Sequence, residues 1–256
     1  EAWTVRVVAA SYALGFAFTN AAMGVAAPSL IETFKSAEPL STVILSALAL
    51  GERERFVTLT MLLPIVGGVA MASYGSAAFS ILGMMLALAS NVAFSARAVA
   101  TKSLYRHHPN APSSRSDMTL FYHVSVLGFA ALTPVALLLE AQTLLDALLA
   151  ETMASLTRLL LVLVANGAAH AVYNGVSFRM LAKVSVTTHA VLNIFRRVVM
   201  IALTATLFGT PVSPFNWAGI ALTALGFAGF ARSKTDRKPG KRSQRTLLPM
   251  TEERSL

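Results

Sequence analysis

The sequence predicts an all-α membrane protein, a polytopic bundle of helices, from three observations. Of the 256 residues, 55% are hydrophobic and only 13% are charged, whereas about a quarter of a soluble domain is charged. The charged residues gather between long apolar runs, which suits a chain whose solvent is mostly lipid. These runs reach the roughly 20 residues that a spanning helix needs, and they lack the period-two alternation of barrel strands.

Eight apolar runs are predicted to cross the membrane as helices. They are Val7–Val25, Pro28–Leu50, Phe56–Tyr74, Ala77–Thr101, Met118–Leu139, Leu159–Phe178, Val184–Phe208 and Pro214–Ala231. Small residues are dense within them, as at Gly67-Gly68 and Ala77-Ala78. Such residues predict close helix packing in lipid and indicate nothing about activity.

Five prolines occur in these runs. Pro28 and Pro214 suit the first turn of a helix, where the missing N–H costs little. Pro39, Pro64 and Pro134 fall inside runs. We expect the helices to continue through them, because neighbouring groups in a membrane can satisfy the freed carbonyl.

The basic residues indicate how the chain is oriented. Threading eight spans sends one set of connections to each side of the membrane. One side receives Arg6, Arg53, Arg55, Lys102, Arg106, Arg115, Arg179, Lys183 and a basic tail, and the other receives Glu140, Asp146, Glu151 and Arg158. By the positive-inside rule, the basic side is predicted to face the cytosol or the stroma of a plastid.

The chain is expected to hold one membrane domain, residues 1–232, followed by a basic, disordered tail, residues 233–256. The first residue is Glu1, and no targeting segment precedes the first apolar run, so we expect an incomplete N-terminus. No Cys is present, which excludes disulfides and thiolate metal sites. Membrane topology explains the net charge of +9, and nucleic acid is not expected as a partner.

Several ionisable residues lie inside the runs, where a charge costs about 2.5–3.5 kcal/mol. They are Glu32, Lys35, Glu38, Arg97, His123, His170, His189, Arg196 and Arg197. Lys35 is three residues from each of Glu32 and Glu38, which predicts one shared helix face, either as an ion-pair ladder or as a cavity wall. Arg97 lies near the end of its run, so a snorkelling side chain is an alternative there. The three His residues are interpreted as structural.

The arginine pair carries the strongest indication of function. Arg196 and Arg197 are adjacent in the middle of a run that contains no acid. Successive helical residues point about 100° apart, so lipid-facing snorkelling cannot rescue both. Four interior cations against two carboxylates leave about +2, which matches the charge of a phosphate ester, and guanidinium groups fit phosphate well. No catalytic, metal-ligand or cofactor motif appears, so an enzyme is not expected.

Several motifs in order resemble the plastidic phosphate translocators of the triose-phosphate transporter family. The stretch YNGVSFRMLAKVSVTTHAVLNIFRRVVMI, from Tyr173, resembles the family's YNQ element followed by T-H-x-V-x-N-x-x-K-R. The segments TNAAMG, FKSAEPLSTVILSALALGE, PIVGGVAMAS, SNVAFSARAVATKSL and FGTPVSPFNWAG also fit, in the same order. The stretches TPVSP and SVTTHAV are most similar to the phosphoenolpyruvate branch.

This resemblance implies a fold and a function. The family has ten transmembrane helices in two inverted halves, within the drug/metabolite transporter superfamily, so the eight spans would be its third to tenth. It implies a secondary antiporter that exchanges a phosphorylated C3–C6 metabolite for inorganic phosphate by alternating access. The implied membrane is the plastid inner envelope, and neither a cofactor nor a metal is implied.

The resemblance also implies a binding site. By motif position, Lys35, Arg196 and Arg197 would bind the phosphate moiety, whereas Thr19, Arg97 and Tyr173 would bind phosphate oxygens or the far end of the substrate. Three departures from the family bear on the site. Arg196 stands where the family has Lys, Phe16 where it often has His, and Leu192 where it has Gly.

Two alternatives remain open at this point. A nucleotide-sugar or other organic-anion transporter of the Golgi or endoplasmic reticulum membrane would share the fold, although such carriers usually lack a basic pair like Arg196 and Arg197. A non-transporting scaffold or degenerate paralogue would explain the expected missing helices, Phe16 and Leu192.

Overall fold

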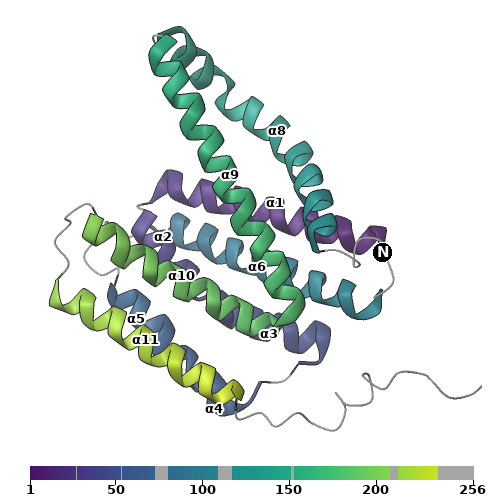
Figure 1. The fold of residues 1–256 in the computed structure, drawn as a ribbon, viewed down its shortest axis with the longest axis vertical. Coiled ribbons are helices and arrows are strands. Elements are labelled where there is room, and N and C mark those ends of the chain that lie inside the picture. The colour runs from purple at the N-terminus through teal and green to yellow at the C-terminus, as the bar shows by residue number, and fades with distance from the viewer. Residues whose placement is uncertain are drawn as a thin grey trace, which may run out of the picture.

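The computed structural model describes residues 1–26, 28–52, 54–72, 80–108, 117–150, 153–207 and 213–235, and every regular element in these ranges is an α-helix (Figure 1). The helices are α1 (Ala2–Val25), α2 (Pro28–Lys35), α3 (Glu38–Leu50), α4 (Phe56–Thr60), α5 (Leu62–Ala72), α6 (Ile81–His107), α8 (Asp117–Ala150), α9 (Met153–Lys183), α10 (Val186–Leu207) and α11 (Pro214–Thr235). Five of them, α1, α6, α8, α9 and α11, contain stretches long and apolar enough to cross a membrane. The predicted all-α membrane fold is therefore confirmed.

The predicted span Pro28–Leu50 is not one helix, which corrects the expectation that Pro39 would be tolerated in mid-helix. Helix α2 ends at Lys35, and α3 begins at Glu38 with Pro39 in its first turn. In a continuous helix, the Pro39 ring would clash with the carbonyl of Lys35, four residues earlier. The backbone amide of Ala37 and the side chain of Asn91 instead donate to the Phe34 carbonyl, at 3.1 and 2.9 Å.

The span Phe56–Tyr74 is divided in the same way. Helix α4 ends at Thr60, and α5 begins at Leu62, two residues before Pro64. The ring of Pro64 would meet the carbonyl of Thr60, so the same steric rule explains this second break. By contrast, α8 continues through Pro134, as expected.

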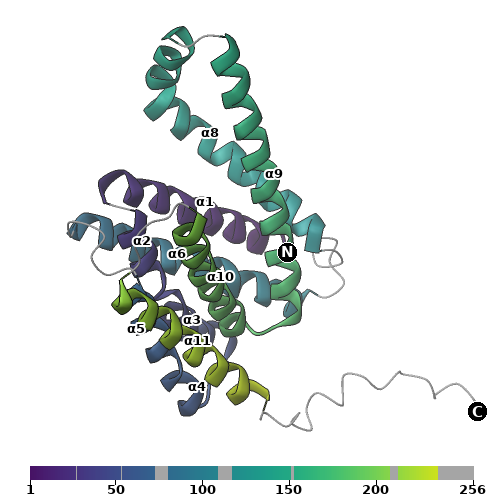
Figure 2. The same cartoon turned by 60° about the vertical axis from the view of Figure 1, so that its left-hand side comes forward.

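The helices form a bundle from which one pair extends. Helices α1 and α6 lie side by side, α8 packs on α1, and α5 packs on α11. A Cβ added to Gly68 of α5 would lie only 2.4 Å from the hydroxyl oxygen of Thr223 on α11, so this close packing requires glycine. The distal parts of α8 and α9 stand clear of the other helices (Figures 1 and 2).

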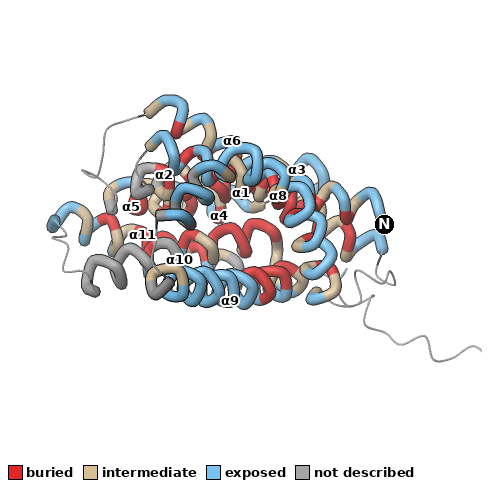
Figure 3. The backbone as a smooth tube through the Cα atoms, turned by 90° about the horizontal axis from the view of Figure 1, so that it is seen from above, coloured by how far each residue is buried: buried red, intermediate tan, exposed pale blue. Residues whose placement is uncertain are grey.

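Buried residues concentrate where the helices meet in the interior of the bundle (Figure 3). One apolar cluster joins α1, α6, α8 and α9 around Val8, Leu104 and Phe178. A second cluster joins α5, α10 and α11 around Ile65 and Ile194. Large apolar side chains also cover the outside, as lipid contact requires; Leu48 and Leu138 are more than four-fifths exposed.

Several basic residues share one end of the bundle. The last residues of α3, α6 and α9 meet there, and Val5 and Val8 near the start of α1 pack in one cluster with Leu104 near the end of α6. This end, which carries Arg6, Lys102, Arg106, Arg179 and Lys183, is called the basic end below.

Helix α11 extends to Thr235, three residues beyond the predicted domain boundary. Arg53, Arg115, Ala77-Ala78 and residues 236–256 lie outside the described residues, and the inverted relation of the two halves stays a prediction.

Candidate functional site: a charged central cavity

A cavity of about 250 Å³ opens inside the bundle between α1, α2, α3, α6, α9 and α10. Five of the six predicted site residues line it: Thr19, Lys35, Arg97, Tyr173 and Arg196. The backbone of Arg197 follows Arg196 in α10, but its side chain lies outside the described residues. The tertiary structure thus gathers side chains that are up to 177 positions apart in the sequence.

Lys35 is held against α1 inside this cavity. Its Nζ donates to the hydroxyl oxygen of Thr19 at 2.7 Å and lies 5.1 Å from the centre of the Phe94 ring. The Thr19 oxygen is also 2.8 Å from the Gly15 carbonyl and 2.8 Å from the Ser90 hydroxyl. A hydroxyl has one proton to donate. Because Thr19 has acceptors nearby on Gly15 and Ser90, it can accept from Lys35 and so fix the position of the ammonium group.

The break between α2 and α3 places charges of opposite sign at the two helix ends that it creates. Lys35 lies in the last turn of α2 and Glu38 in the first turn of α3, which are the ends where the helix dipole favours a cation and an anion respectively. The prediction that Glu32, Lys35 and Glu38 share one helix face was wrong, because no single helix contains all three. They nevertheless all line the cavity.

Arg97 is the most deeply buried cation of the site. Only 4% of the residue is exposed, and its guanidinium carbon lies 5.1 Å from the centre of the Phe178 ring and 5.9 Å from that of Tyr12. Its Nε and Nη1 have no hydrogen-bond partner within the described part of the chain. The snorkelling alternative for Arg97 was therefore wrong. A buried cation with unused donors is costly unless an anion joins it.

Arg196 is supported by Tyr173 of α9. The guanidinium carbon lies 4.6 Å from the centre of the Tyr173 ring, a distance at which a cation is attracted to the ring face. The Tyr173 hydroxyl donates to the side-chain oxygen of Asn193 at 3.1 Å. Asn193 precedes Arg196 by nearly one turn of α10, so Tyr173 connects α9 to two consecutive turns of α10.

An aromatic wall closes another part of the cavity. Phe16 packs edge-on against Phe94 and His170, with ring centres 5.2 Å apart in both pairs. The position where the family often has His therefore contributes an apolar surface. Of the other two histidines inside the predicted spans, His189 is buried and lies 2.8 Å from the Ser177 hydroxyl, whereas His123 is exposed on α8.

Sequence reasoning missed Ser90, Phe94 and Asn193. Asn193 belongs to the T-H-x-V-x-N element, so its motif position was a usable signal. Ser90 and Phe94 lie in the quoted segment SNVAFSARAVATKSL, but their residue types gave no sign of a site, because small hydroxyl and aromatic residues are common in membrane helices. Three basic and two acidic side chains line the cavity, a formal excess of one positive charge without Arg197.

The fold and this cavity define a polytopic helical membrane protein with a small, positively charged interior chamber. The profile of the Triose-phosphate Transporter family matches residues 1–230, and the chain belongs to that family. The resemblance seen in the motifs is thus confirmed over nearly the whole described chain.

Curated relatives include plastid phosphate translocators. The chain is 38% identical over 224 residues to phosphoenolpyruvate/phosphate translocator 1, chloroplastic, of Oryza sativa subsp. japonica, covering 87% of this chain and 54% of the relative. It is 29% identical over 232 residues to glucose-6-phosphate/phosphate translocator 1, chloroplastic, of Arabidopsis thaliana, covering 90% and 58%. The chain therefore spans little more than half the length of these relatives.

A solved crystal structure shares the fold. It superposes with a TM-score of 0.65 at 20% sequence identity, covering 90% of this chain and 78% of that one. At this identity the likeness concerns the arrangement of helices and not the substrate.

Proposed function

We propose that this protein exchanges a phosphorylated C3–C6 metabolite for inorganic phosphate across the plastid inner envelope by alternating access. The observation that carries the proposal is Arg97, a buried cation that lines the same cavity as Lys35 and Arg196 and has two donor atoms without a partner within the described part of the chain. Phosphate supplies the missing acceptors and the missing negative charge. The names of the relatives, which include phosphoenolpyruvate, triose phosphate and glucose 6-phosphate translocators, support the same substrate class.

The size of the cavity favours the small end of this substrate range. Pockets for drug-sized ligands usually measure about 300–1,000 Å³, and this cavity measures about 250 Å³. A three-carbon phosphate ester fits that space better than a nucleotide sugar, which carries a base and two sugars. Phosphoenolpyruvate and triose phosphate are therefore the first substrates to test.

The proposed roles of the individual residues follow from their motif positions. Lys35, Arg196 and Arg197 bind the phosphate moiety, and Arg97 and Tyr173 bind phosphate oxygens or the far end of the substrate. Thr19 contributes by positioning Lys35, because its hydroxyl oxygen already accepts a hydrogen bond from the Lys35 ammonium group at 2.7 Å. Transport by this arrangement breaks no covalent bond, so no catalytic residue is assigned.

The charge of the cavity gives a reason for strict exchange. An empty chamber with excess positive charge is costly to enclose in a low-dielectric interior. A bound phosphate ester or inorganic phosphate neutralises the chamber, so the loaded carrier closes and reopens readily, whereas the empty carrier does not. Inward and outward fluxes then become coupled one to one.

Reconstitution into liposomes tests the proposal directly. Vesicles loaded with phosphate should take up labelled phosphoenolpyruvate or triose phosphate, and phosphate-free vesicles should take up almost none. A panel with 3-phosphoglycerate, glucose 6-phosphate and a nucleotide sugar ranks the substrates. Equal uptake into phosphate-free vesicles would contradict obligatory exchange. Uptake of the nucleotide sugar alone, or of no substrate at all, would overturn the assignment.

A further inference from the structure

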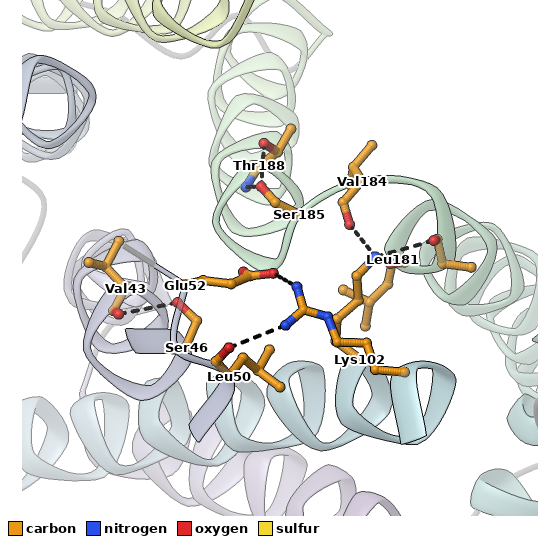
Figure 4. A network of polar contacts seen from close by, with 11 residues as sticks. Val43, Ser46, Leu50, Glu52, Lys102, Leu181, Val184, Ser185 and Thr188 are labelled. Carbon is orange, nitrogen blue, oxygen red and sulfur yellow. Dashed lines mark hydrogen bonds and ion pairs between the residues drawn. The ribbon is translucent and has the colours of Figure 1, made fainter. Parts of the chain in front are cut away.

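Lys102 fastens the end of α6 to the turn between α9 and α10 (Figure 4). Its Nζ donates to the backbone carbonyls of Leu181 and Ala182 at 3.2 Å and of Val184 at 2.9 Å. An ammonium group has three protons to donate, and these three carbonyls can accept all of them. The carbonyls end a helix, where the dipole also favours a cation.

Arg106 fastens the same end of α6 to α3. It follows Lys102 by four residues, so the two side chains project from neighbouring turns on one side of α6. Its Nη1 donates to the carbonyl of Leu50, the last residue of α3, at 3.3 Å, and its Nη2 forms an ion pair with Glu52 just beyond. Lys102 and Arg106 are together called the latch.

An apolar layer lies between the latch and the cavity. Ala98 and Val99 of α6 pack against Leu181 and Val186, with side chains of α3 added at the edge. Arg97, which lines the cavity, directly precedes this layer in α6, and Lys102 follows it. At 1.5 Å per residue, Lys102 is displaced about 7.5 Å along the helix axis from Arg97. Along α6, the apolar layer and then the latch thus follow Arg97 toward the basic end.

We propose that Lys102 and Arg106 are gating residues and that their bonds to α9–α10 and α3 must break before the cavity opens to the basic end. The helices that the latch joins, α3, α6, α9 and α10, are also helices that line the cavity. When these helices move apart at the basic end, the residues of the apolar layer separate and the cavity gains a path to solvent. The inference rests on the proposed transport function, but its test does not require transport.

The chain contains no Cys, so a thiol-specific reagent would react only with a Cys that is introduced for the test. Val99→Cys puts a single thiol in the apolar layer, at a position only 5% exposed. The protein is placed in lipid nanodiscs, and the rate of labelling by a water-soluble maleimide is measured. Lys102→Met keeps the length of the side chain but removes its donors, so labelling should become several-fold faster. Lys183→Met, at an exposed position of the same end, is the matched control and should leave the rate unchanged.

Arg106→Gln provides a second latch variant if Lys102→Met does not fold. Unchanged labelling in the folded latch variants would overturn the gate. A Tm equal to that of the Val99→Cys parent shows that faster labelling in a latch variant comes from opening and not from a loss of folded protein. If the parent protein exchanges no phosphate but the latch variants label faster, the gate stands and the proposed function fails. If the parent protein exchanges phosphate and the latch variants are labelled no faster than the parent, the gate is overturned and the proposed function is kept.

Discussion

The ammonium group of Lys35 donates to the hydroxyl oxygen of Thr19 at 2.7 Å, joining α2 to α1 within the cavity. Both residues are more than nine-tenths buried. The same oxygen contacts the Gly15 carbonyl and the Ser90 hydroxyl, so the hydroxyl group that Lys35 binds is itself held in place. A cation placed in this way loses little further freedom when an anion binds.

Thr19→Val should therefore weaken phosphate binding, although valine nearly matches threonine in shape. Losing a hydrogen bond to a charged group costs about 1.5–3 kcal/mol, or roughly 10- to 150-fold in Kd. Thr19→Ser keeps the hydroxyl and should restore most of the affinity. Thr133→Val removes a similar hydroxyl, bonded to its own helix at the Phe129 carbonyl, and serves as the control. Equal Kd values for Thr19→Val and the parent protein, by calorimetry, would remove Thr19 from the site.

Arg97→Met should separate function from stability. The variant loses a buried cation with unused donors, so substrate exchange should fall to background while the Tm in detergent stays equal or rises. Arg179→Met changes an exposed arginine of α9 and should alter neither quantity. A variant that melts earlier and still transports would show that Arg97 acts only in packing.

Tyr173 is expected to contribute through both its ring and its hydroxyl. Tyr173→Phe keeps the ring beneath Arg196 but loses the bond to Asn193, which should cost about 1 kcal/mol, or roughly fivefold in the Kd for phosphate. Tyr173→Ala also loses the cation–π contact and should bind more weakly still. Tyr122→Phe, on the exposed face of α8, is the control. If Tyr173→Phe and Tyr173→Ala bind phosphate equally, the ring has no supporting role.

Pro39→Ala should disturb the site by removing the cause of a helix break. Without the pyrrolidine ring, α2 and α3 can join across Ser36 and Ala37, which would rotate Lys35 relative to Glu38. We expect weaker phosphate binding with little loss of stability, measured by calorimetry and by Tm. Pro134→Ala, in the continuous helix α8, should leave binding unchanged. Parent-like affinity in Pro39→Ala would show that the break does not position Lys35.

Much of the fold was readable because lipid imposes a simple rule. Every backbone group in a membrane needs an internal partner, so a long apolar run becomes a helix. The predicted runs agree with the helices within a few residues at most ends; α8, for instance, begins one residue before the predicted Met118 but continues to Ala150. The breaks at Pro39 and Pro64 were missed because the expected rescue by neighbours was weighed above the steric clash.

The cost of burying charge made most of the candidate site readable from the sequence. Arg97, Lys35 and Arg196 stand out in apolar runs wherever they point. Ser90 and Phe94 do not, because a serine or phenylalanine is unremarkable in such a run. The contacts of Lys102 and Arg106 could not be predicted for a different reason. Basic residues at a helix end are expected from membrane topology alone.

The amino-acid sequence alone determined that the chain forms membrane helices, which of its charges lie inside them, and which family its motifs resemble. Hydropathy, charge and motif order are local properties, so each is visible without knowing which helices are neighbours. Only the tertiary structure decided that Thr19 holds Lys35, that two donors of Arg97 have no partner within the described residues, and that Lys102 and Arg106 join the ends of neighbouring helices. These relationships depend on distances between residues that are far apart in the chain, and only the packing of the helices sets those distances.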